Sequence, residues 1–92
     1  MAEWTFLTNH GLVLSFVGAH PECTGLEIGQ AIGITERAVR RILTDFQTEG
    51  YIQTERIGRR SRYHIRTEMP LRHQHERSAT VGDLLRLLTR TE

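Results

Sequence analysis

The chain lacks several features that mark common classes of protein. Its 92 residues include one cysteine, Cys23, so no internal disulfide can form, which suits a reducing cytoplasm. No apolar run approaches the length of a membrane span, and no basic stretch precedes an apolar one near the N-terminus. We therefore expect a cytoplasmic protein without a membrane span or a secretory signal. A chain of this length favours one domain with a modest core, which gains from a partner chain.

Lysine is absent as well, and every basic residue is an arginine. The net charge is only +1, but residues 1–34 carry −3 and no arginine, whereas residues 35–66 carry eight arginines against four acids. Residues 67–92 are neutral. Such a concentrated basic block is the electrostatic footprint of a nucleic-acid binder. Arginine binds phosphate and guanine bidentately, as lysine cannot, although genome base composition explains the preference for arginine at least as well.

Residues arranged for catalysis or metal binding are also missing. Cys23 has no activating basic partner nearby in the sequence, no glycine-rich loop is suited to cradle phosphates, and Glu27 is explained by helix capping. The pairs His20 with Cys23 and His73 with His75 do not match a zinc site, which needs three or four converging ligands. We therefore expect no enzymatic activity, no metal and no other cofactor.

The most informative stretch is residues 25–44, GLEIGQAIGITERAVRRILT. Two short helical patterns meet at Gly33, where a left-handed turn residue is needed. Gly29 is small where two helices would cross at close range, and Ile34 is an apolar residue inside the turn. Thr35 is a good N-cap for the second helix, whose apolar residues recur at the spacing of one helix face: Val39, Ile42, Leu43 and Phe46.

This pattern resembles the helix-turn-helix of DNA-binding regulators. Those motifs place an apolar, a small and an apolar residue before the turn glycine and an apolar residue after it. Here the places are filled in order by Ile28, Gly29, Ile32, Gly33 and Ile34. The two buried places of the second helix are filled by Val39 and Ile42. The chain departs from the pattern at the small residue, where alanine is usual, and glycine there weakens the helix by up to about 1 kcal/mol.

Further helices are predicted on either side of this motif. The first starts at Thr8 or Asn9, runs to about Ala19, and is apolar enough to be central to the core. Trp4 and Phe6, which precede it, are expected in the core. Capping boxes predict where the second helix and the last helix begin, and their residues are Thr24 with Glu27 and Thr80 with Asp83.

After a third helix from Glu36 to about Glu49, stopped by Gly50, residues 52–65 indicate a β-hairpin. Its predicted loop has four residues, Gly58, Arg59, Arg60 and Ser61. Ile52 and Ile57 fall on opposite faces of a regular strand, which a bulge or a strand that begins after Ile52 would repair.

A helix-turn-helix followed at once by a basic-tipped hairpin is a winged helix. With TERAV at 35–39, EGYI at 49–52 and GRRSRY at 58–63, the chain resembles small winged-helix transcriptional regulators of the MarR and ArsR kind over residues 8–66. It lacks the long flanking helices of full MarR proteins and the paired metal thiolates of metal-sensing ArsR proteins.

The C-terminal part is predicted to be a linker and a helix. Residues 67–79 are polar and aperiodic and contain Pro70, so we expect a linker that crosses the surface. The helix within residues 80–92 is marginal alone and must pack its apolar stripe on its own core or on a second copy. We expect it to form a homodimer through Val81, Leu84, Leu85 and Leu88.

The predicted fold class is mainly α with a small β-hairpin: a winged helix-turn-helix with a three-helix core and a wing in residues 1–66, plus the C-terminal helix. In a helix-turn-helix the N-terminal half of the second helix enters the major groove, where arginine binds guanine or phosphate and glutamate accepts from cytosine. Wing arginines contact phosphates or the minor groove. The predicted DNA-binding residues are Thr35, Glu36, Arg37, Arg40, Arg41, Thr44, Arg56, Arg59, Arg60 and Arg62.

We therefore expect a sequence-specific regulator of transcription that binds double-stranded DNA. Two alternatives stay open: a winged helix used as a protein–protein module, whose basic face docks an acidic partner, and a protein that binds RNA. The sequence indicates neither an operator, nor an effector, nor whether the protein activates or represses.

Overall fold

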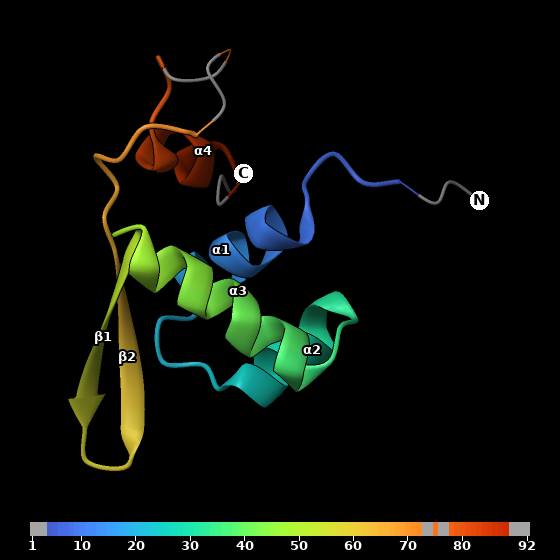
Figure 1. Cartoon of the computed structure of the whole chain (residues 1–92), viewed down its shortest axis with the longest axis vertical. Helices are drawn as coiled ribbons and strands as arrows, with labels where there is room; N and C mark the ends of the chain where they lie inside the picture. Colours follow the sequence, from blue (N-terminus) through green and yellow to red (C-terminus); the bar gives the residue numbers. More distant parts are fainter. Residues whose placement is uncertain (1–3, 73–74, 76–77, 89–92) are drawn as a thin grey trace.

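The helices and the hairpin follow one another in the order expected for a winged helix. The computed structural model describes residues 4–72, 75 and 78–88. Its elements are α1 (Asn9–Ala19), α2 (Gly25–Ile32), α3 (Glu36–Thr48), β1 (Ile52–Ile57), β2 (Arg60–Ile65) and α4 (Val81–Leu88). Figure 1 shows α1, α2 and α3 packed together, the antiparallel hairpin standing out to one side, and α4 across α1 from α2. The predicted fold class, mainly α with a small hairpin, is confirmed.

Side-chain caps fix the start of each helix. Thr8 and Thr35 each accept a hydrogen bond from the backbone N–H three residues further on, at 3.2 and 3.1 Å. At α2 the predicted capping box is complete, since the Thr24 hydroxyl accepts from Glu27 N at 3.1 Å and the Glu27 carboxylate accepts from Thr24 N at 2.8 Å. The predicted box before α4 forms in the same way, with bonds of 3.0 and 3.1 Å. These bonds satisfy amides that have no partner within the helix.

The turn between α2 and α3 depends on two glycines. Gly33 is left-handed as predicted, with φ 83° and ψ 32°. Gly29 also serves the turn, because its carbonyl accepts from the amides of Gly33 and Ile34 at 2.8 and 3.0 Å. A Cβ on Gly29 would lie 2.6 Å from the carbonyl oxygen of Ile34. The close approach is therefore to the turn backbone rather than to a crossing helix, and it explains why glycine stands where alanine is usual.

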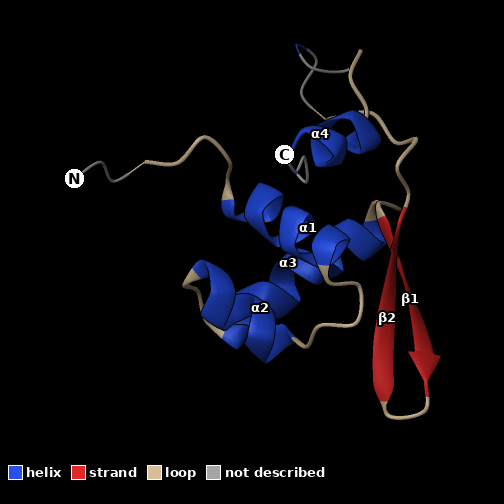
Figure 2. Cartoon of the chain, turned by 180° about the vertical axis from the view of Figure 1, so that it is seen from behind, coloured by secondary structure: helices blue, strands red, loops and turns tan. Residues whose placement is uncertain are grey.

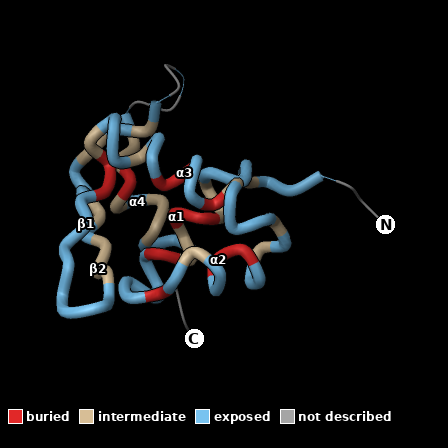
Figure 3. Tube along the Cα trace, turned by 60° about the horizontal axis from the view of Figure 1, so that its bottom comes forward, coloured by how far each residue is buried: buried red, intermediate tan, exposed pale blue. Residues whose placement is uncertain are grey.

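The core lies where α1, α2, α3 and the base of the hairpin meet (Figure 3). The predicted inward residues of α3 are buried or half-buried, and Ile34 packs against the core from the turn. The aromatic residues before α1 are not in the core, however: Trp4 is 67% exposed and Phe6 93% exposed. That expectation was wrong because it rested on general burial tendencies alone. The buried residues are Val13, Leu14, Val17, Cys23, Ile28, Val39, Ile42, Leu43, Tyr51, Ile52 and Val81.

The hairpin has a tighter turn than predicted. β1 and β2 pair without a break from Ile52 opposite Ile65 to Ile57 opposite Arg60, so the loop has two residues instead of four. Gly58 has φ 61°, whereas Arg59 has no positive φ, which is the pattern of a type II′ turn. The bulge or late strand start is not needed, because Ile52 is buried and Ile57 is 44% exposed on the other face.

The C-terminal helix packs on the chain's own core. The segment that carries it is bonded to the domain where the Tyr51 hydroxyl donates to Pro70 O at 2.8 Å, and its end is bonded back to its beginning where Val81 N donates to Met69 O at 2.8 Å. The Val81 side chain is 1% exposed, and Leu85 packs against the core. Val81 is therefore not available to a second chain, while a dimer through the rest of the stripe stays a prediction. Residues 89–92 of the predicted helix lie outside the described part of the chain.

Candidate nucleic-acid interface

The outward face of α3 carries three of the predicted contact residues. Successive helical residues are about 100° apart, so Arg37, Arg41 and Thr44 lie opposite the buried side formed by Val39, Ile42 and Leu43. All three outward side chains are exposed. Within the described part of the chain, Arg37 and Arg41 have no hydrogen bond or ion pair. Their guanidinium groups therefore give up no hydrogen bond or ion pair with the described residues when they meet a ligand.

The flank of α3 is already paired. Arg40 donates to the Glu36 carboxylate at 3.1 Å, and the side chains are 74% and 44% exposed. Such an exposed pair contributes little stability and is easily exchanged for another partner. The two predicted threonines are also engaged, since Thr35 caps the helix and the Thr44 hydroxyl donates to Arg40 O at 2.9 Å. Arg40 thus forms an ion pair within the helix, whereas Arg37 and Arg41 form none with the described residues.

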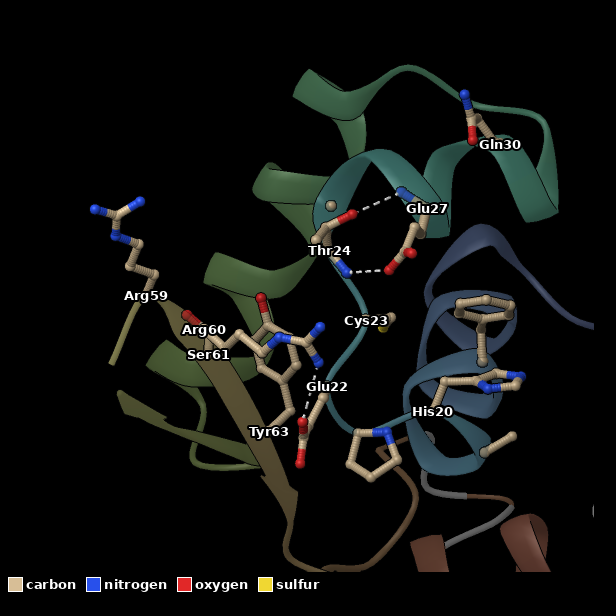
Figure 4. Close-up of a pocket in the computed structure, with 14 residues that line it drawn as sticks. His20, Glu22, Cys23, Thr24, Glu27, Gln30, Arg59, Arg60, Ser61 and Tyr63 are labelled. Carbon is tan, nitrogen blue, oxygen red and sulfur yellow. Dashed lines mark hydrogen bonds and ion pairs between the residues drawn. The ribbon is translucent and has the colours of Figure 1, made fainter. Parts of the chain in front are cut away.

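The wing is fastened to the loop between α1 and α2. The Glu22 carboxylate accepts hydrogen bonds from Nε and Nη2 of Arg62, the first at 3.1 Å, and from Nη1 of Arg60 at 3.4 Å. One residue earlier in the loop, the carbonyl of Pro21 accepts from Tyr63 N at 2.8 Å. Figure 4 shows Glu22 and Arg60 meeting between this loop and β2, with Arg59 pointing away. A backbone bond and an ion pair therefore fix the wing relative to the helices.

The ion pair shifts the proton equilibrium of its acid. The hydrogen bond from Arg62, and then its charge, hold the pKa of Glu22 below its ordinary value of 4.5. At neutral pH Glu22 is therefore an anion that offsets part of the wing's positive charge. Arg59 at the turn has no partner within the described residues, and Arg56 donates only to the carbonyl of Gly58, at 3.3 Å.

The wing and the helix-turn-helix border one groove. Its volume is 880 Å³, and it runs between the wing, through Arg59, Arg60 and Tyr63, and the start of α2. The start of α2 lies beside the start of α3, because a Cβ on Gly25 would come within 3.5 Å of the Glu36 side chain. In Figure 1 the hairpin turn and the N-terminal end of α3 both point to the lower edge of the molecule.

The predicted residues therefore form two neighbouring groups, one on α3 and one on the wing. Arg60 and Ser61 belong to β2 instead of the loop, so only Arg59 of the predicted loop arginines lies in the turn itself. Glu22 is the residue that sequence reasoning missed. Its partners lie 38 and 40 positions away, and no local motif links them.

Other kinds of site find no support in the described residues. No group of three or more His, Cys, Asp or Glu side chains is placed to hold a metal ion there, and His73 lies outside that part. Burial raises the pKa of the Cys23 thiol, which disfavours the reactive thiolate. Among the same residues, none of the helices has both the length and the apolarity to span a bilayer.

Comparison with known proteins does not assign the chain to a family. No protein-family model matches the chain, and no curated protein matches it. The order of the elements is that of a winged helix. The likeness to MarR and ArsR proteins is one of sequence pattern only.

Proposed function

We propose that the protein is a cytoplasmic transcriptional regulator that binds double-stranded DNA sequence-specifically. In this proposal α3 enters the major groove and the wing follows the phosphate backbone or the adjacent minor groove. The observation that supports it best is the pair of neighbouring arginine groups on α3 and the wing. Arg37, Arg41 and Arg59 are exposed and without a partner among the described residues. Exposed basic side chains that have no protein partner are suited to bind a polyanion.

The proposed division of roles follows from how each arginine is held. Arg37 and Arg41 lie at the centre of the outward face of α3, so they are the proposed readers of guanine O6 and N7. Arg40 and Glu36, paired on the flank, are proposed to meet phosphate and cytosine after the pair separates. Arg59 and Arg60 are proposed to bind phosphates without reading sequence.

Selection of bound duplexes from a random DNA pool tests the proposal, followed by titration of the best duplex at rising salt. If the assembly neutralises about 6–10 phosphates, affinity falls roughly a thousandfold or more between 50 and 200 mM salt. A flat salt response, or a pool without enrichment, contradicts sequence-specific DNA binding. Competition with structured RNA separates the RNA alternative. If the protein binds an acidic protein but no duplex, the result favours the alternative of a winged helix that serves as a protein–protein module.

A further inference from the structure

Helix α1 has an uncovered apolar side. Residues 9–19 include no Asp, Glu, Arg or Lys, and their one ionisable side chain, His10, contacts Asp45 of α3 at 2.8 Å, so the helix is largely apolar. Such a helix is normally covered all round. Here Val13, Leu14 and Val17 face the core, whereas the opposite side opens into a groove of 500 Å³. Groove residues are contributed by the segment before α1 and by α1, α2 and α4: Leu7, Leu12, Ser15, Phe16, Ile32 and Leu88, with Ala19 and Ala31.

A second uncovered apolar feature is the arm that precedes α1, residues 4–7. Trp4 and Phe6 pack edge to face with ring centroids 5.1 Å apart, yet they are among the most exposed large apolar residues described. The Thr5 hydroxyl donates to the carbonyl of Leu7, and Leu7 folds back onto Gly11, where an added Cβ would lie 3.1 Å from it. Trp4 and Phe6 do not line the groove that Leu7 of the same arm borders. Figures 1 and 2 both show the arm leaving the helical body.

We infer that the Trp4–Phe6 arm of one copy occupies the α1 groove of a second copy, and that the exchange is reciprocal. Neither residues 4–7 nor the described groove residues include an ionisable side chain, so both surfaces are apolar in the part of the chain that the structure describes. The groove of 500 Å³ is an open depression of the surface, which a projecting arm can enter. Because every copy carries both arm and groove, two copies related by a two-fold axis satisfy both at once.

This interface differs from the stripe predicted on α4 and does not depend on DNA binding. The groove lies on the side of α1 opposite Val13, Leu14 and Val17, which form one core cluster with the inward residues of α3, so the groove is turned away from α3. Of the predicted stripe only Leu88 takes part, at the rim of the groove. Nucleic acid is not a suitable occupant because the described residues of the groove include no cation.

The oligomeric state of the whole chain tests the inference. Sedimentation velocity of the parent protein is expected to show a monomer–dimer equilibrium. Trp4 is the only tryptophan, so its emission is expected to shift to the blue as concentration rises and the ring leaves water. The double variant Trp4→Ser, Phe6→Ser is expected to weaken the dimer at least about tenfold. Leu26→Ser, which removes a side chain 53% exposed on α2 outside the groove, is the matched control and keeps the dimer.

A blocked groove provides the complementary test. Ala31 is exposed on the groove wall, so Ala31→Glu places a charge there without entering the core. Ala31→Glu is expected to be monomeric alone, and circular dichroism checks that each variant keeps the parent's fold. A mixture of the arm variant and Ala31→Glu pairs one intact arm with one intact groove, so it is expected to restore part of the dimer. A parent that stays monomeric, an arm variant that dimerises like the parent, or blue emission independent of concentration each overturns the inference.

Discussion

Glu22 and Arg62 lie forty residues apart in the sequence, yet the carboxylate of the first accepts two hydrogen bonds from the guanidinium of the second. The same carboxylate also accepts from Arg60. A phosphate would compete for these guanidinium groups, because it offers the same kind of acceptor. Glu22 therefore both positions the wing and opposes the polyanion binding that we propose for it.

The first prediction concerns pH. The lowered pKa of Glu22 means that its stabilising contribution is present above the ordinary value of 4.5 and is lost as pH falls through the folded-state pKa below it. We expect the NMR signals of the Arg62 Nε–H and of the wing amides to move in that acid range. In Glu22→Gln they should already lie near the acid-state positions at pH 7 and should not titrate with Glu22. Identical titrations of parent and variant would mean that the pair does not form in solution.

The second prediction concerns binding by Glu22→Gln. Removing the anion releases Arg60 and Arg62, so affinity for duplex DNA should rise and the salt slope should steepen by about one to two units of log K per log salt. Glu68→Gln makes the same charge change beside Arg66, outside the two strands, and controls for net charge. Fluorescence anisotropy at several salt concentrations measures both. Equal gains in the two variants would show that net charge alone is responsible.

The third prediction separates the helix from the wing. Arg37→Ala should cost about 1–3 kcal/mol against one preferred base and so change which duplexes bind. Arg59→Ala with Arg60→Ala should weaken all duplexes alike and reduce the salt slope. Arg72→Ala, an exposed arginine of the segment before α4, is the control. Binding to a duplex library reports the preference, and a wing variant that alters it while Arg37→Ala does not would reverse the roles.

The fourth prediction concerns the turn between α2 and α3. Gly33→Val should destabilise the fold by about 1–3 kcal/mol or more, because a β-branched residue resists the left-handed backbone at φ 83°. Gly25→Ala is the control, since its added Cβ meets the Glu36 side chain at an ordinary 3.5 Å. Thermal melts followed by circular dichroism compare them. A Gly33→Val melting temperature equal to the parent's is incompatible with a left-handed turn there.

The fifth prediction tests whether α4 belongs to the monomer. Val81→Ala removes two buried carbons, so it should cost about 2 kcal/mol from lost burial and the cavity left behind. Leu87→Ala on the same helix, at a side chain 62% exposed, should have almost no effect on the monomer. Urea unfolding at low protein concentration measures the difference. If the two substitutions cost the same, α4 does not pack on the core as described.

Much of the fold could be predicted because its determinants are local. Gly33, the Thr24–Glu27 capping box and the spacing of Val39, Ile42 and Leu43 each act within a few residues, and each is found as predicted. The prediction that Arg60 lies in the hairpin loop was wrong because its position depends on pairing with another strand and not on its neighbours in the sequence. It is polar and exposed whether it lies in a loop or in a strand of a two-stranded hairpin, so only the pairing with Ile57 places it in β2.

The features that could not be predicted depend on distant parts of the chain. The arginines of the candidate site could be identified from charge and spacing. Which of these arginines form ion pairs with carboxylates could not be predicted. Arg62 is engaged because the fold brings Glu22 to it. Trp4 and Phe6 were assigned to the core because large aromatic residues are usually buried, and no pattern in residues 4–7 says otherwise. Whether α4 meets its own core likewise depends on where the chain returns after the hairpin.

The two-stranded wing also has a consequence for solubility. A hairpin of two strands has two outer edges, of which that of β2 is bonded to the carbonyl of Pro21 through Tyr63 N, and unpaired edge groups are templates for strands of other molecules. Glu55, Arg56, Arg60 and Arg62 place charges along these edges, so the proposed DNA contacts also keep copies from joining edge to edge. Stripping all the wing arginines at once would therefore risk aggregation that mimics a loss of binding, whereas single Arg→Gln changes keep the edges polar.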